Sequence, residues 1–261
     1  MLKRKDKKNA KQNDWHRAAV MLLVCSLLLS LVPEVMAKKK TSGNFYDTKW
    51  SYNTKRKTLT LSCKGRMDDE YSSYNGGYWA WHEWSDDIQK AVVKEGVTYL
   101  GEGTFHYCRK LKQVTLPKSL KEIGTDAFMS SGISEITLPN QLKKISEYAF
   151  WDSELKEIKI SKNVTQIGRY AFWNCKKLEK VTLSPNLKKI SQAMFCQCVK
   201  LKTITLPKNI TRIENGAFYE SGLTNITIPK KVTTIEKEVF YHCTSLKKVT
   251  FETQKLKTIS S

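Results

Sequence analysis

The chain has 261 residues, of which 40% are hydrophobic and 27% are charged. This composition supplies enough apolar residues for a buried core, so it excludes an intrinsically disordered chain. The formal net charge of +20 favours polyanionic partners through steering and counterion release, but a solvated lysine-rich surface would give the same charge.

Residues 1–37 have the order of a secretory signal peptide. Residues 1–17 hold seven Lys or Arg, residues 18–33 hold no charge, and Ala37 ends a small-residue cleavage pattern. The apolar run is shorter than the roughly 20 residues of a spanning helix, which favours cleavage over an uncleaved membrane anchor. We therefore predict a secreted or cell-surface protein that meets the membrane only through its signal segment.

Removal of residues 1–37 takes away seven basic and three acidic residues and leaves a formal net charge of +16. An exported protein rarely meets nucleic acid, so we expect no nucleic-acid partner. An extracellular protein, an anionic glycan or a cell-envelope polymer is the favoured class of partner.

Phenylalanine recurs at intervals of 22 or 23 residues along most of the chain. These repeat Phe residues are Phe105, Phe128, Phe150, Phe172, Phe195, Phe218 and Phe240. After each one comes a β-branched segment with alternating apolar residues, such as residues 111–116, which predicts a strand with one buried face. One repeat cannot bury that face alone, so the repeats must stack and their strands must pair in parallel, about 4.8 Å apart.

A second apolar pair follows each strand, as in Leu120 and Ile123, and predicts an opposite wall. The repeat Phe comes next, usually behind a small residue such as Ala127. We interpret this last segment as a single helical turn.

Residues 88–261 resemble the BspA-type leucine-rich repeats of bacterial surface and secreted proteins. The resemblance rests on a motif that recurs seven times, as in Leu111-x-x-Val114-Thr115-Leu116. It implies a leucine-rich repeat solenoid: a right-handed coil with a parallel β-sheet on its concave face and short strands and helical turns on its convex side. About seven repeats and a partial eighth are expected.

Residues 38–87 are expected to form a linker and a β-rich N-terminal cap of the kind that precedes such repeats. Trp50-Ser51-Tyr52 and residues 58–62 carry this likeness, which is looser because Ala80-Trp81 replaces the family's usual Pro-Trp. No C-terminal cap follows residues 256–259, so the last strand is expected to fray or to support end-to-end self-association.

Four cysteines stand three residues after a repeat Phe, where the other repeats have serine. The cysteines are Cys108, Cys175, Cys198 and Cys243, and the serines are Ser131, Ser153 and Ser221. A residue that alternates with serine as the turn shortens by one position is typical of a buried turn-filler, so we predict free thiols and no disulfide framework.

No catalytic or metal site is indicated by the sequence. His82, His106 and His242 lie in no metal-ligand spacing, and no nucleophile elbow or phosphate loop is present. The carboxylates are not paired as a glycoside hydrolase requires. We therefore predict a protein that is not an enzyme and has no cofactor and no metal.

Two surfaces are candidates for partner binding. The outward strand positions hold seven Lys and three Glu, with Lys156 and Lys159 in one repeat, and would give salt-sensitive polar contacts. The positions two before and one after the repeat Phe hold two aromatic pairs that stacking would gather into one cluster. These pairs are Tyr148 with Trp151 and Tyr170 with Trp173.

Aromatic side chains pack on sugar faces or on partner side chains, but the same rings could pack on one another to shield the solenoid. The hypothesis that the family resemblance implies is an extracellular binding or adhesion module for a protein or a glycan. The alternative is a structural surface repeat protein without a defined ligand. Fold alone does not choose between them.

Overall fold

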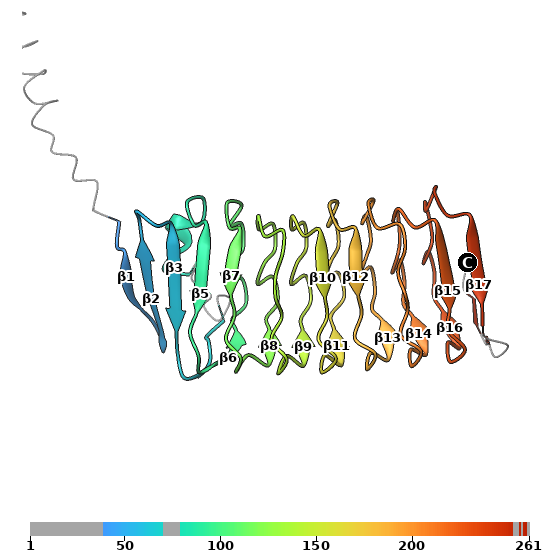
Figure 1. Ribbon diagram of the computed structural model, residues 1–261, viewed down its shortest axis with the longest axis horizontal. Coiled ribbons are helices and arrows are strands. Elements are labelled where there is room, and N and C mark those ends of the chain that lie inside the picture. Colours follow the sequence, from blue (N-terminus) through green and yellow to red (C-terminus); the bar gives the residue numbers. More distant parts are fainter. Residues whose placement is uncertain (1–38, 70–78, 253–255, 257, 260–261) are drawn as a thin grey trace, which may run out of the picture. The chain divides into compact units, whose positions relative to one another are not determined.

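The computed structural model describes residues 39–69, 79–252, 256, 258 and 259. The predicted signal peptide therefore lies outside the described residues, and all elements below belong to the compact unit Thr41–Ser261. The predicted solenoid of stacked parallel strands is confirmed (Figure 1). Within the described ranges, the short 3-10 helix η2 (His82–Trp84) is the only helix, and no helix there has the length and apolarity of a membrane span.

The N-terminal strands cover the first edge of the solenoid. Strands β1 (Ser42–Phe45), β2 (Thr48–Asn53) and β3 (Thr58–Ser62) form an antiparallel meander, and β3 then pairs in parallel with β5 (Lys90–Val93). The meander thus satisfies backbone N–H and C=O groups that β5 would otherwise leave open at a sheet edge.

Trp81 ties this cap to the first repeat. Its side chain is 1% exposed, and its indole N–H donates a hydrogen bond to the carbonyl oxygen of Thr104 over 3.0 Å. The indole of Trp79 stacks on it with ring centroids 4.5 Å apart. The replacement of Pro by Ala80 therefore leaves a buried tryptophan in place at the junction.

We call one turn of the solenoid a coil and name it by its repeat Phe. Each coil contributes a segment to a first wall, then a segment to a second wall, and then the turn that holds the Phe. After β5, the first-wall strands are β7 (Gln113–Thr115), β10 (Glu157–Lys159), β12 (Lys180–Thr182), β15 (Asn225–Ile228) and β17 (Lys248–Phe251). Their apolar residues alternate inward, as Ile226 and Ile228 do in β15.

The second wall is made mostly of strands two residues long, and from β8 to β16 each ends on a buried isoleucine. Its strands are β4 (Gly65–Arg66), β6 (Val97–Leu100), β8 (Glu122–Ile123), β9 (Lys144–Ile145), β11 (Gln166–Ile167), β13 (Lys189–Ile190), β14 (Arg212–Ile213), β16 (Thr234–Ile235) and β18 (Thr258–Ile259). Strand β18 pairs in parallel with β16, which agrees with a partial eighth repeat.

The coils are not paired evenly along the two walls. At both ends of the solenoid, successive coils pair on both walls, as β5 with β7 and β6 with β8. In the middle, each coil pairs with the next on one wall alone. Two expected first-wall strands, residues 133–138 and 201–206, are not strands, and these coils pair with their neighbours on the second wall. Conversely, β10 pairs with β12 at the step where β11 and β13 do not pair.

The core is a continuous stack of the repeat Phe rings. From Phe105 to Phe218 these side chains are 0% exposed, and Phe240 is partly buried. Neighbouring centroids lie 5.1 to 5.9 Å apart with nearly parallel planes. The interval of 22 or 23 residues places one ring in each coil, so the stack fixes the register of everything beside it.

Candidate functional site

The turn around the repeat Phe is not the expected helical turn. In every coil from Phe105 to Phe240, the residues two before and two after the Phe have a left-handed backbone, with φ between 48° and 64°. Tyr148 and Tyr170 are two of these residues, with φ of 54° and 60°. A right-handed helix needs negative φ at each residue, so the prediction of a helical turn is wrong.

This alternating backbone directs N–H groups toward the next coil. In the Phe150 coil, the N–H groups of Tyr148, Phe150 and Asp152 donate to carbonyl oxygens of the Phe172 coil over 3.1, 2.9 and 2.8 Å. The same three bonds recur along the solenoid, and we call them the Phe ladder. The Phe ladder therefore holds the side chains beside the Phe in register, although it belongs to neither wall.

Tyr148, Trp151, Tyr170 and Trp173 form one cluster, as the sequence predicts, and we call it the aromatic cluster. The tyrosine rings stack with centroids 4.8 Å apart and planes within 3°, and the indoles stack at 5.1 Å and 3°. Within each coil, the tyrosine and the tryptophan lie 5.3 and 5.2 Å apart at a tilt. The four rings thus form a two-by-two block.

The block is neither buried nor freely exposed. All four side chains are half-buried, in contrast to the fully buried repeat Phe rings beside them. Burial is also the main cause that raises the pKa of Tyr148 above its ordinary value. Each ring stacks one face on its counterpart in the other coil, as the shielding interpretation expects, but each side chain remains partly exposed to a partner.

Polar side chains fix the C-terminal side of the cluster. The Nε2 atom of Gln192 donates to the hydroxyl of Tyr170 over 2.9 Å, and the indole N–H of Trp173 donates to Oε1 of Gln197 over 3.0 Å. Ala193 is the equivalent of Tyr170 in the next coil. One face of Tyr170 stacks on Tyr148. Among the described residues, the other face of Tyr170 therefore carries no stacked ring.

Lys156 and Lys159 lie apart from the aromatic cluster. Both side chains are exposed on the first wall, Lys159 within β10 and Lys156 directly before it. Among the described residues, no hydrogen bond, ion pair or ring contact joins either lysine side chain to the cluster. The two candidate surfaces are thus separate, and the lysines belong to the strand face.

A groove that no sequence pattern predicts opens on the second wall between β11 and β13. Its volume is about 920 Å³, and it lies at the step where these two strands do not pair. One coil earlier, the N–H of Gly168 donates to Ile145 over 2.8 Å. At the open step this backbone bond is replaced by the side-chain hydroxyl of Ser191, which donates to the carbonyl oxygen of Ile167 over 2.5 Å.

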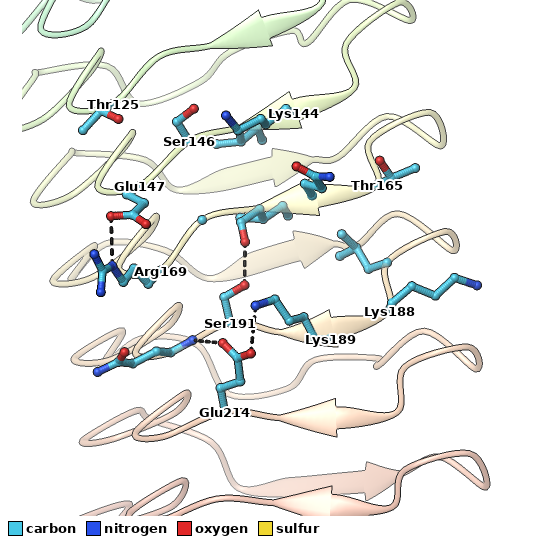
Figure 2. Close-up of a pocket in the computed structure, with 16 residues that line it drawn as sticks. Thr125, Lys144, Ser146, Glu147, Thr165, Arg169, Lys188, Lys189, Ser191 and Glu214 are labelled. Carbon is cyan, nitrogen blue, oxygen red and sulfur yellow. Dashed lines mark hydrogen bonds and ion pairs between the residues drawn. The ribbon is translucent and has the colours of Figure 1, made fainter.

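Charged side chains line this second-wall groove. Figure 2 shows Glu147 and Arg169 at one end, Lys188 at the other, and Lys189 and Glu214 between them. Arg169 Nε lies 2.9 Å from a Glu147 oxygen, and Lys189 Nζ lies 2.8 Å from a Glu214 oxygen. Lys144 also lines the groove, so four cationic side chains face two carboxylates and the groove has a positive balance.

The described residues offer no metal centre and no activated thiol. No three His, Cys, Asp or Glu side chains gather there as a metal site would require. Burial raises the pKa of the Cys108 and Cys175 thiols to about 12, which keeps them protonated at neutral pH. The arrangement is suited to binding through side-chain contacts.

Comparison with known proteins gives the family of this repeat. The model of the BspA type leucine rich repeat region matches residues 81–198 and 165–261, with six copies. A leucine-rich repeat protein from Bacteroides ovatus is similar in structure, with a TM-score of 0.57 and 23% identity over 81% of this chain and 71% of that one. The comparison with curated proteins finds no match.

Two further solved structures are similar at lower TM-scores. A leucine-rich repeat protein from Eubacterium ventriosum has a TM-score of 0.49 and 23% identity over 80% of this chain and 71% of that one. A leucine rich cell surface protein from Faecalibacterium prausnitzii has a TM-score of 0.38 and 18% identity over 83% and 96%. At these identities it is the Bacteroides likeness that shows the fold. Because the family model matches more than half of its length, this chain belongs to the BspA-type leucine-rich repeat family.

Proposed function

We propose that this chain is a non-catalytic binding module that acts outside the cell and contacts a protein or glycan partner through its aromatic cluster. The observation that carries this proposal is the two-by-two block of half-buried rings beside a fully buried Phe stack. The signal-peptide pattern of residues 1–37 supports export.

A purely structural role does not require these four rings. The Phe stack already fills the core, and the corresponding positions in the Phe195 coil are Ala193 and Cys196. A coil therefore closes without large aromatic side chains at these positions. Large rings that add contact area while remaining half-exposed are typical of residues that dominate interfaces.

The cluster is also preorganised for binding. The Phe ladder fixes the backbone on each side, and Gln192 and Gln197 hold the Tyr170 hydroxyl and the Trp173 indole. A partner would therefore immobilise few side chains when it docks, which lowers the entropic cost of association.

The exposed lysines support this contact in a secondary way. Lys156 and Lys159 lie on the first wall among Glu157 and Glu179, so the field of this face is diffuse. A diffuse field raises the rate of encounter but does not orient a partner. We therefore assign the lysines to attraction of the partner and the rings to specific contact.

The alternative is a structural surface repeat protein without a defined ligand. The stacking of the four rings on one another favours it, because rings that shield the solenoid would also stack. The two functions predict different outcomes in one experiment.

The experiment is a panel of immobilised glycans and matrix proteins, probed with the protein that lacks residues 1–37 at low and at physiological salt. The proposal expects saturable binding of a restricted set of ligands that survives at physiological salt. Binding of every anionic ligand at low salt and of none at physiological salt would leave only the charge effect and would support the structural alternative.

A further inference from the structure

The second-wall groove lies where two successive coils separate on one side only. On the first wall β10 pairs with β12, and on the Phe ladder Tyr170 N–H donates to Gln192 over 2.9 Å. Only the second wall is open at this step, because β11 and β13 do not pair. The Phe172 and Phe195 coils are thus closed along two lines and separated along the third.

The groove leads directly to the aromatic cluster. Arg169 and Gln192, which line one end of the groove, are the residues before Tyr170 and Ala193. Gln192 also donates to the Tyr170 hydroxyl over 2.9 Å. The face of Tyr170 that carries no stacked ring is turned toward the next coil, because its other face is stacked on Tyr148. Gln192 therefore links the groove to the hydroxyl end of Tyr170.

The far end of the groove presents an uncompensated positive charge. The side chain of Lys188 is exposed, and no carboxylate of the described residues forms an ion pair with it. Lys189 and Arg169 are paired with Glu214 and Glu147. An anionic ligand group would thus be attracted to Lys188 without breaking an ion pair.

Neutral polar side chains also line the groove. Thr165 and Gln166 offer a hydroxyl and an amide group that both donate and accept hydrogen bonds, and the Ser146 hydroxyl donates to Glu122 over 3.2 Å. Sugar hydroxyls have the same dual capacity, and the apolar face of a pyranose ring packs on an aromatic ring. This combination fits a sugar better than it fits a purely apolar ligand.

We propose that the second-wall groove and the unstacked face of Tyr170 form a site for an acidic oligosaccharide, a chain of pyranose rings that carries carboxylate or sulfate groups. The proposal deepens the proposed function, on which it rests, by naming the ligand class and its path. One sugar ring packs on Tyr170, the chain follows the groove along β11 and β13, and an acidic group reaches Lys188.

An extended peptide is a poorer fit for the same groove. A peptide that adds to a sheet edge relies on free backbone groups along that edge. Here the carbonyl oxygen of Ile167 already accepts the hydroxyl of Ser191, so the edge of β11 is partly occupied. An acidic peptide is therefore a competing ligand for the test to exclude.

The test is calorimetric titration of the purified protein with oligogalacturonate, with sulfated dextran oligosaccharide, with neutral dextran oligosaccharide and with a poly-glutamate peptide. Binding of the carboxylated or the sulfated sugar, and of neither neutral sugar nor peptide, is expected. The acidic sugar that binds with the higher affinity identifies the acidic group, carboxylate or sulfate. Absence of binding by both acidic sugars, or equal binding of the peptide, would overturn the proposal.

Matched variants locate the site. Thr165→Trp fills the groove, whereas Thr211→Trp places the same ring at the equivalent position two coils later, outside the groove. Lys188→Ser and Lys121→Ser remove the same charge at equivalent positions inside and outside it. Tyr170→Asn removes the ring, and asparagine tolerates the left-handed backbone there.

We expect Thr165→Trp and Tyr170→Asn each to weaken binding by about tenfold or more, which is the effect of losing roughly 1.4 kcal/mol. Lys188→Ser should weaken it several-fold at low salt, and both control variants should bind as the wild type does. Equal losses in Lys188→Ser and Lys121→Ser would show a general charge effect and overturn the site. If Trp151→Ala abolished binding of a protein partner while no acidic sugar bound, the proposed function would stand and this inference would fall.

Discussion

The thiol of Cys175 donates a hydrogen bond to the carbonyl oxygen of Phe150 in the preceding coil, over 3.0 Å. Cys198 and Cys243 make the same bond one coil back, over 3.2 and 2.9 Å. Serine occupies the equivalent position in the shorter coils. In these three coils the position three residues after the repeat Phe is therefore a small buried donor that joins coils. In the described residues all six cysteines carry free thiols.

These thiols should remain reduced and unreactive in the folded protein. Burial raises the pKa of Cys175 to about 12, so the reactive thiolate is scarce at neutral pH. Mass analysis without reductant should show no crosslink among Cys108, Cys175, Cys198 and Cys243, and alkylation should require denaturant. A stoichiometric disulfide between any two of them would contradict the turn-filling role.

Phe172→Ala should cost about 3–5 kcal/mol of unfolding free energy, the range for deletion of a buried aromatic side chain. The ring is 0% exposed and lies between Phe150 and Phe195 at 5.5 Å from each. Chemical denaturation measures the loss, and Lys176→Ala, an exposed change in the following turn, is the control with an effect within about 0.5 kcal/mol. An unchanged midpoint for Phe172→Ala would mean that the Phe stack is not the core.

Gly222→Ala tests how coils of different length fit together. Gly222 lies in a turn that is one residue shorter than the corresponding turn of the preceding coil. A Cβ added to Gly222 would lie 2.0 Å from the carbonyl oxygen of Val199 in that longer turn. We expect a loss of about 1–3 kcal/mol from this overlap. Glu154→Ala, at the equivalent position of a short coil that follows another short coil, should change the unfolding free energy by less than about 0.5 kcal/mol. Equal effects of both substitutions would refute the length argument.

Asp126→Asn should stabilise the protein at neutral pH but not in acid. Burial, and then the charge of Glu147, raise the pKa of Asp126 from 3.8 to about 6. The folded state therefore binds the proton more tightly than the unfolded state, so the wild type loses stability as pH rises from about 4 through 6.

The asparagine variant escapes this loss and also suits the left-handed φ of 53° at this position. Its advantage over the wild type should grow by about 1 kcal/mol between pH 4 and pH 7, a value reduced for the partial exposure of the group. Thermal unfolding at both pH values measures it, and Glu135→Gln, on an exposed side chain, controls for the loss of one negative charge. A pH-independent difference would show that the carboxyl is not destabilised by its surroundings.

Much of the fold could be predicted because it depends on periodicity. One Phe and one strand segment in each interval of 22 or 23 residues require stacking, and they place Tyr148 beside Tyr170 and Trp151 beside Trp173. The family was recognisable from the same motif, and the family match confirms it.

The prediction of a helical turn around the repeat Phe is wrong, although the sequence holds a signal for the left-handed backbone. Gly103 and Gly216 occupy left-handed positions that glycine favours, and Asn174 occupies another. None of the left-handed positions beside a repeat Phe holds a β-branched residue. Helical spacing was inferred instead because the aromatic pairs are three residues apart, as in one turn of a helix.

The second-wall groove could not be predicted from the sequence. The segments that form β11 and β13 have the same length and the same apolar pattern as their neighbours. No position in these two segments marks the step at which pairing moves from one wall to the other. The separation of Lys156 and Lys159 from the aromatic cluster likewise follows only from the three-dimensional arrangement.

The central claim, that the aromatic cluster makes the specific contact, is tested most directly by one binding comparison. Two double variants, Trp151→Ala with Trp173→Ala and Lys156→Ser with Lys159→Ser, are measured against the ligand that the panel identifies, at low and at physiological salt. Circular dichroism first checks that both variants are folded. The tryptophan variant should lose binding by about a hundredfold or more at both salt concentrations, as loss of a paired interface anchor does. The lysine variant should weaken binding several-fold, mainly at low salt. Loss of binding in the lysine variant with retention in the tryptophan variant would contradict the claim and place the contact on the first wall.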